Sequence, residues 1–136
     1  MLTTKCINPA IMEALAYCGH GSKILIADGN YPLQEKSGNA KKVHLALSPD
    51  LPTVMDVLRA LQSVVNIEHA AVMVPEDGSV PEIFADFRDA LGGMALTEME
   101  RYAFYAACMA EGEVALAIST GETRTFANIL LTVGCA

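Results

Sequence analysis

Basic residues are scarce in this chain of 136 residues, which carries 9 lysines and arginines against 16 aspartates and glutamates. The formal net charge is −7 at pH 7 with neutral histidines, and the longest basic run is Lys41-Lys42. A protein with this net negative charge is repelled by the phosphate backbone of nucleic acid and by an anionic membrane surface. Neither nucleic acid nor a membrane is therefore expected as a partner.

Long hydrophobic runs are also missing. No apolar stretch approaches the roughly 20 residues that a membrane-spanning helix needs, and the first residues lead into a capped helix without the apolar segment of a signal peptide. We therefore expect a cytoplasmic protein. Since 52% of the residues are hydrophobic and only 18% are charged, we expect a substantial core and apolar surface buried between copies in a homo-oligomer.

The sequence lacks the common motifs of cofactor and metal chemistry. It contains no GxGxxG, no Gly-Lys-Ser/Thr phosphate loop, no HExxH and no GxSxG. The three histidines have no metal-ligand spacing, so no metal site is predicted. None of the four cysteines forms a CxxC pair, and all are predicted to be reduced, buried thiols: Cys6, Cys18, Cys108 and Cys135.

What the sequence does contain is an alternation of helical and strand patterns, over a length that predicts a single domain, residues 1–136. Helices are predicted over 8–18, from 48–52 to 65, and over 81–91. Strands are predicted over 23–27, 43–47, 69–74, 113–120 and 128–133. Residues 94–99 fit either a short strand or the start of a helix through 102–109. The pattern predicts an α/β sandwich with a central, mainly parallel sheet flanked by helices.

Two candidate residues for chemistry flank the first predicted strand. His20 lies between two glycines on a turn, where an imidazole can reach a ligand, although an exposed loop histidine gives the same pattern. Asp28 follows the strand, at the end where ligands of open α/β sheets bind, although an aspartate there can simply cap a turn. An extended strand would hold them about 16–20 Å apart. They can share a site only if the turn folds back or if one comes from another subunit.

Three further residues have side chains that suit sugar hydroxyls. Arg101 and Tyr105 are four apart and share a face if their segment is helical. Hydrogen-bond donors held beside an aromatic ring can bind the hydroxyls and the apolar face of a sugar. The same spacing also occurs where the aromatic side chain packs in the core and the arginine extends to solvent. Asn128 enters an apolar strand, where its amide could bond vicinal hydroxyls or satisfy a turn.

Together these segments resemble the D-ribose pyranase / L-fucose mutarotase family. The matching stretches are Gly19-His20-Gly21, Ile-Leu-Ile-Ala-Asp at 24–28, Tyr31-Pro32, Arg-Tyr-Ala-Phe-Tyr at 101–105, Thr120-Gly121-Glu122, and Ala-Asn-Ile-Leu-Leu at 127–131 with Gly134. They occur in the family's order and spacing over nearly the whole chain. The resemblance implies a cofactor-independent isomerase that opens and recloses a monosaccharide ring. It also implies ring-shaped homo-oligomers, commonly decamers, with sites between subunits.

The resemblance assigns roles to individual residues. His20 matches the family's acid/base histidine and Asp28 its ligand-binding aspartate, so both are expected to be catalytic. Arg101 stands where the fucose branch carries arginine and the ribose branch histidine, which favours L-fucose or a similar sugar as the substrate. Asn128 matches the Asn of the family's Tyr-x-Asn motif. The expected substrate-binding residues are Asp28, Arg101, Tyr105, Phe126 and Asn128.

One position departs from the family pattern, because Phe126 replaces the tyrosine of the Tyr-x-Asn motif. The change removes a hydroxyl that can donate and accept a hydrogen bond. Tyr31, Tyr102 or Tyr105 could supply that hydroxyl instead. The alternative function is therefore a non-catalytic sugar-binding or regulatory homologue. An α/β nucleotide-binding module is a more distant alternative, which the acidic balance and the missing phosphate loop disfavour.

Overall fold

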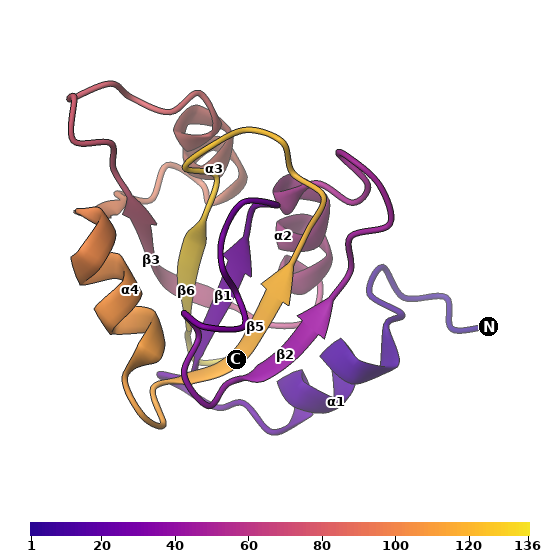
Figure 1. Ribbon diagram of the computed structural model, residues 1–136. Helices are drawn as coiled ribbons and strands as arrows, with labels where there is room; N and C mark the ends of the chain where they lie inside the picture. The colour runs from indigo at the N-terminus through magenta and orange to yellow at the C-terminus, as the bar shows by residue number, and fades with distance from the viewer.

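In the computed structural model, which describes residues 1–136, six strands form one sheet in the order β2-β5-β1-β6-β3-β4 (Figure 1). The strands are β1 (Lys23–Ala27), β2 (Lys41–His44), β3 (Ile67–Met73), β4 (Thr97–Met99), β5 (Val114–Ser119) and β6 (Ile129–Val133). The pairs β2–β5, β5–β1 and β3–β4 are parallel. Strand β6 is antiparallel to both of its neighbours, β1 and β3. The expected mainly parallel sheet is confirmed.

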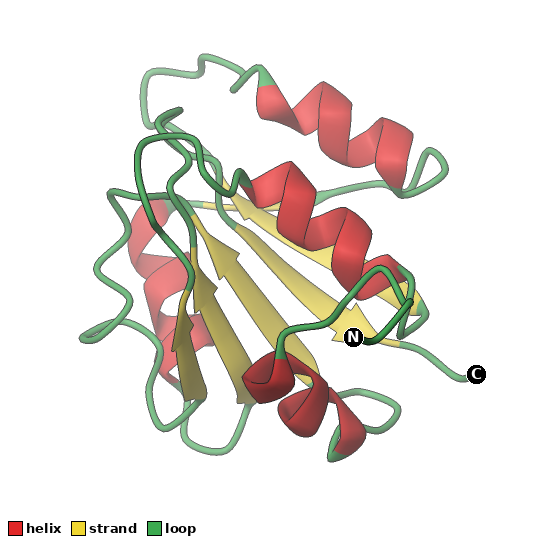
Figure 2. Ribbon diagram, turned by 90° about the vertical axis from the view of Figure 1, so that its right-hand side faces the viewer, coloured by secondary structure: helices red, strands yellow, loops and turns green.

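Helices cover both faces of this sheet. They are α1 (Pro9–Ala16), α2 (Val54–Gln62), α3 (Ile83–Ala90) and α4 (Arg101–Met109). Helices α1, α2 and α3 pack against one face of the sheet and α4 packs against the other (Figure 2). In β1, Ile24 and Ile26 join the core beneath α1, α2 and α3, whereas Leu25 and Ala27 face the α4 side. A strand buried on both faces is a continuous apolar run, which is why the predicted strand 23–27 coincides with β1.

Capping residues explain where the helices begin. Asn8 Oδ1 accepts the Ile11 N–H at 3.0 Å, so α1 starts where the Asn-Pro pair predicts. Thr53 caps α2 in a reciprocal capping box with Asp56, later than the 48–52 start predicted from the sequence. Glu100 caps α4 and separates it from β4. Residues 94–109 thus contain both a short strand and a helix.

Two predictions about local structure are wrong in part. The strand predicted over 43–47 ends at His44, because its partner β5 ends at Ser119, directly opposite. All four cysteines are free, but Cys135 is exposed beyond the end of β6 and Cys18 is only half-buried beyond the end of α1. The predicted helix 8–18 extends two residues past the end of α1 and so placed Cys18 inside it, whereas Cys135 lies beyond both the predicted and the observed end of the last strand. No helix has the length and apolar character needed to cross a membrane.

A buried carboxylate holds the loop between β5 and β6. Glu122 is 2% exposed and accepts hydrogen bonds from Val54 N at 3.3 Å and from Arg124 Nε at 2.8 Å. Arg124 also donates to Asp86 at 3.2 Å. The hydrogen bond to Glu122 is the main cause that raises the pKa of Arg124. The loop is thereby tied to the start of α2 and to α3.

Arg124→Met is expected to lower the free energy of unfolding by about 3 kcal/mol, because it leaves the buried Glu122 carboxylate without its cation. Urea unfolding measures the change. Arg59→Met is the matched control, since Arg59 is exposed and forms no ion pair; a change within about 0.5 kcal/mol is expected there. Equal effects of the two substitutions would contradict the structural role of Glu122.

Candidate functional site

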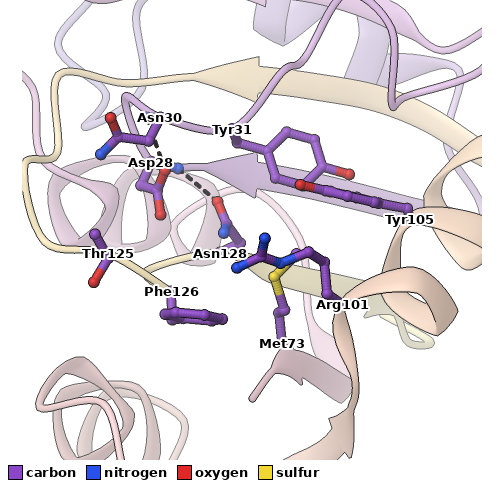
Figure 3. Close-up of a pocket in the computed structure, with 9 residues that line it drawn as sticks. All are labelled: Asp28, Asn30, Tyr31, Met73, Arg101, Tyr105, Thr125, Phe126 and Asn128. Carbon is purple, nitrogen blue, oxygen red and sulfur yellow. Dashed lines mark hydrogen bonds between the residues drawn. The ribbon is translucent and has the colours of Figure 1, made fainter. Parts of the chain in front are cut away.

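The carboxyl ends of β1, β3 and β5 and the start of β6 lie along one edge of the sheet. The register places Ile129 of β6 opposite Ile26 of β1 and Val72 of β3. Ligand sites of open α/β sheets form at such an edge because the loops diverge there. A cavity of about 240 Å³ opens at this place (Figure 3). It is lined by Asp28, Asn30, Tyr31, Met73, Arg101, Tyr105, Thr125, Phe126 and Asn128.

Asp28 and Asn128 are buried against each other at this cavity, each 3% exposed. The Asp28 N–H donates to Asn128 Oδ1 at 2.8 Å. The Asp28 carboxylate accepts the N–H of Asn30 at 2.9 Å and that of Ala127 at 3.1 Å, one on each oxygen. The Asn128 side chain also acts on the Asp28 carboxylate and lowers its pKa, so its Nδ2 donor lies beside this carboxylate at the cavity. The pair therefore offers a fixed carboxylate and a fixed amide donor.

Burial raises the pKa of Asp28, and the hydrogen bonds to its carboxylate offset this only in part. Ionisation of Asp28 therefore costs more free energy in the folded chain than in the unfolded chain. Stability from this group is fully present below the unfolded pKa of about 3.9 and is lost as the pH rises through the higher folded pKa.

The free energy of unfolding of the wild type, minus that of Asp28→Asn, is therefore expected to fall as the pH rises from about 4. Urea unfolding of both proteins over a pH series measures this difference. The pKa values of Asp56 and Asp77 are lowered, by hydrogen bonds with Thr53 and Ser79. Their opposite contributions are common to both proteins and cancel. A difference that increases with pH would contradict the raised pKa of Asp28.

Free hydrogen-bond donors line the α4 side of the cavity. Arg101 begins α4, forms no ion pair, and lies with its guanidinium carbon 5.6 Å from the centre of the Phe126 ring. Tyr105 follows one turn later, and its hydroxyl makes no hydrogen bond within the chain. The Tyr31 hydroxyl instead donates to Lys36 O at 2.7 Å, and burial raises the pKa of Tyr31. Of the tyrosines that could replace the missing hydroxyl, Tyr105 is thus the one in the cavity with a free group.

Phe126 has a strained backbone. Its φ angle is 56°, in the left-handed region that few residues other than glycine adopt. This conformation sits just before Ala127, whose N–H donates to Asp28. Strain of this kind clusters at ligand sites, where the surrounding structure holds it in place. The aromatic ring thus forms a defined apolar wall beside Arg101.

His20 lies at the opposite edge of the sheet from the cavity. Its turn is closed by Ser22 N–H donating to Gly19 O at 3.0 Å and is fixed to β6 by Gly21 N–H donating to Val133 O at 2.8 Å. The His20 side chain is 59% exposed. The turn does not fold back, so His20 and Asp28 of one chain do not share a site. Of the two arrangements that the sequence left open, only one between subunits would bring them together.

The other candidate residues are brought together from distant parts of the sequence. Asp28, Arg101, Tyr105, Phe126 and Asn128 all line the one cavity. Sequence reasoning missed Asn30, Met73 and Thr125 as lining residues. Met73 is the last residue of β3 and lies one residue before the end of the predicted strand 69–74, so its position was a usable signal for the edge of the site. No three His, Cys, Asp or Glu side chains gather where they could hold a metal ion.

Comparison with known proteins identifies the family. The family model described as "RbsD / FucU transport protein family" matches residues 1–136. The chain belongs to the RbsD / FucU family. It is 28% identical over 134 residues to a D-ribose pyranase of Coprothermobacter proteolyticus, covering 98% of both proteins.

Solved structures share the fold of this RbsD / FucU chain. Bacillus subtilis RbsD complexed with D-ribose aligns with a TM-score of 0.85 at 24% identity, covering 100% of this chain and 99% of the other. The fucose mutarotase of Streptococcus pneumoniae in complex with L-fucose aligns with a TM-score of 0.84 at 22% identity, with the same coverage. The family is thus one of sugar pyranases and mutarotases, and both branches are represented among these relatives.

Proposed function

We propose that this chain is a monosaccharide mutarotase for L-fucose or a similar sugar, with a site completed by His20 of an adjacent subunit. The observation that carries the proposal is the composition of the cavity, which holds a buried carboxylate and free donors but no imidazole. His20 is exposed on a fixed turn at the opposite edge, where it can reach a neighbouring copy. This placement supports a homo-oligomer, for which the family resemblance indicates a decameric ring.

The reaction needs two proton transfers. The anomeric hydroxyl loses a proton while the ring oxygen gains one, and the bond between the anomeric carbon and the ring oxygen breaks. The open-chain aldehyde rotates, and the ring oxygen then attacks the other face with the reverse transfers. No electrons are gained or lost. An imidazole nitrogen with a free lone pair can accept the proton of the anomeric hydroxyl and then donate it to the ring oxygen, so His20 can serve both transfers.

The remaining polar groups suit the binding of sugar hydroxyls. The Asp28 carboxylate can accept from one hydroxyl, and its fixed position avoids reorganisation when a ligand binds. The Tyr105 hydroxyl and the Arg101 guanidinium are donors without partners inside the chain, and the Asn128 amide is a third donor at the same cavity. Together they can hold several hydroxyls of one ring in a single orientation.

The apolar part of the cavity supports a 6-deoxy sugar such as L-fucose. Met73 and the Phe126 ring give the cavity two apolar side chains (Figure 3). A methyl group against such a wall gains free energy from burial, whereas a hydroxymethyl group in the same place leaves its hydroxyl unpaired. Arg101, the residue type of the fucose branch, points to the same substrate.

Saturation-transfer NMR on L-fucose, L-galactose and D-ribose tests the proposal. L-galactose differs from L-fucose only in carrying a hydroxymethyl group in place of the methyl group. We expect the protein to accelerate anomer exchange of L-fucose, and that of L-galactose less. Absence of acceleration on all three sugars would overturn the proposed catalysis. Faster exchange of L-galactose than of L-fucose would overturn the role given to the apolar wall.

A non-catalytic sugar-binding homologue is the second candidate, and the observation that favours it is Phe126 in place of the family tyrosine. Calorimetry on L-fucose distinguishes the two. Binding without accelerated exchange would establish the second candidate. The free hydroxyl of Tyr105 in the same cavity supports turnover instead.

A further inference from the structure

We propose that Glu68 is a positioning residue for His20 and that it makes Nδ1 the imidazole atom that exchanges protons with the sugar. The inference rests on the proposed function. His20 Nε2 lies 3.0 Å from both Oε1 and Oε2 of Glu68. A carboxylate only accepts hydrogen bonds, so Nε2 must carry the proton in this contact. In the neutral ring Nδ1 is then the acceptor, and it makes no hydrogen bond within the chain.

The strand order brings the two residues together. His20 precedes β1, Glu68 is in β3, and β6 lies between these strands. The side chains therefore meet across the end of β6, at Gly134. A Cβ at Gly134 would lie 3.1 Å from the Cβ of Glu68 and 3.4 Å from its Oε2. The glycine leaves the room that the Glu68 side chain occupies.

Both partners are held by backbone hydrogen bonds to the same strand. The His20 turn is joined to β6 by Gly21 N–H donating to Val133 O and by Val133 N–H donating to Ser22 O, each at 2.8 Å. On the other side, Gly134 N–H donates to Asn66 O at 2.9 Å, just before β3. Both backbones are thus fixed, and the shared hydrogen bond restricts the remaining rotation of the imidazole.

The contact offers little to stability, since His20 and Glu68 are 59% and 45% exposed and ion pairs in water contribute little. Its main effect falls on the imidazole itself. A carboxylate behind a functional histidine fixes its tautomer and its orientation. With Nε2 engaged, the free Nδ1 edge is the one left to meet the cavity of a neighbouring subunit.

Kinetics of Glu68→Ala and Glu68→Gln test the inference. In Glu68→Ala, kcat for L-fucose exchange is expected to fall about tenfold with KM unchanged, because the imidazole is present but no longer held. Glu68→Gln should lose less, since its amide oxygen can still accept from Nε2. Glu113→Gln is the matched control, because Glu113 is an exposed carboxylate whose partner at 3.0 Å is Lys23; its kinetics are expected to equal the wild type.

Long-range proton–nitrogen NMR of the histidine rings gives a readout apart from activity. At about pH 8.5, where an imidazole is largely neutral, His20 should show a protonated Nε2 and an unprotonated Nδ1. Glu68→Ala should shift the ring signals of His20 and leave those of His44 and His69 in place. The same spectra report whether each variant is folded.

The possible results separate the inference from the proposed function. If the wild type accelerates exchange and Glu68→Ala is equally fast, the role of Glu68 is overturned and the proposed function stands. A protonated Nδ1 in the wild type, or a change confined to KM, would also overturn the role of Glu68. No exchange by the wild type on any sugar overturns both.

Discussion

His20→Ala is expected to slow anomer exchange of L-fucose about a thousandfold, within the range for loss of a general acid–base group. The expected loss is large because no histidine of the chain lines the cavity, so nothing there can replace His20 of the adjacent subunit. Stability should hardly change, since the His20 side chain is 59% exposed and its turn is held by backbone hydrogen bonds. Saturation-transfer NMR measures the rate, and urea unfolding measures the stability.

His69→Ala is the matched control for this substitution. His69 is also exposed, and its Nε2 lies 2.7 Å from Thr97 Oγ1 on β4. We expect exchange to be unaffected in this variant. Calorimetry on His20→Ala should still detect L-fucose, because Asp28 and the donors of the cavity remain. Exchange at the wild-type rate in His20→Ala would contradict the role given to the imidazole.

Asp28→Asn is expected to lower kcat/KM for L-fucose about a hundredfold. This loss corresponds to about 2.8 kcal/mol of transition-state stabilisation. Both carboxylate oxygens of Asp28 accept a backbone N–H, from Asn30 and from Ala127. An amide has only one acceptor oxygen, so its NH₂ group must face one of these N–H donors in either orientation. The variant also loses the charge-assisted hydrogen bond to a sugar hydroxyl, typically about 1.5–3 kcal/mol.

Asp77→Asn serves as the control, because the Asp77 carboxylate bonds only to Ser79 in an exposed loop. Its exchange kinetics should equal the wild type. Calorimetry and kinetics together separate the roles of Asp28 in binding the sugar and in orienting it. A binding defect weakens the affinity measured by calorimetry and raises KM, whereas a misplaced sugar lowers kcat. Asp28→Asn with wild-type kcat/KM would contradict a role for the carboxylate at the site.

The elements of the fold could be predicted where local signals were strong. β1 is a continuous apolar run closed by Asp28, and α1 begins at an Asn-Pro pair, so both lie close to their predicted positions. The end of β2 could not be predicted, because it depends on where the partner strand β5 ends. The end of β6 at Val133, in contrast, coincides with the end of the predicted strand 128–133.

The candidate site could be predicted in its members but not in its geometry. Asp28 stood out at the end of a strand, and Arg101 and Asn128 stood out as side chains that suit sugar hydroxyls. The resemblance to a family then gave these residues their expected roles. Asn128 Oδ1 accepts a hydrogen bond from the Asp28 N–H, and these two residues are 100 positions apart in the sequence. No local pattern predicts such a contact. The partner of His20 was equally hidden, because β6 enters the sheet between β1 and β3 only through the long-range topology. Strand length alone did predict the separation of His20 from Asp28.

Mixed oligomers of His20→Ala and Asp28→Asn test the shared site most directly. The two variants, co-expressed with different tags, form sites in which one chain supplies Asp28 and its neighbour supplies His20. In random equal mixtures about a quarter of the sites have both residues intact, so about a quarter of the wild-type exchange rate should return. Each variant alone should keep no more than about a hundredth of the wild-type rate, with the same oligomer size by light scattering. Mixed oligomers that remain as inactive as their parents would contradict a site shared between subunits.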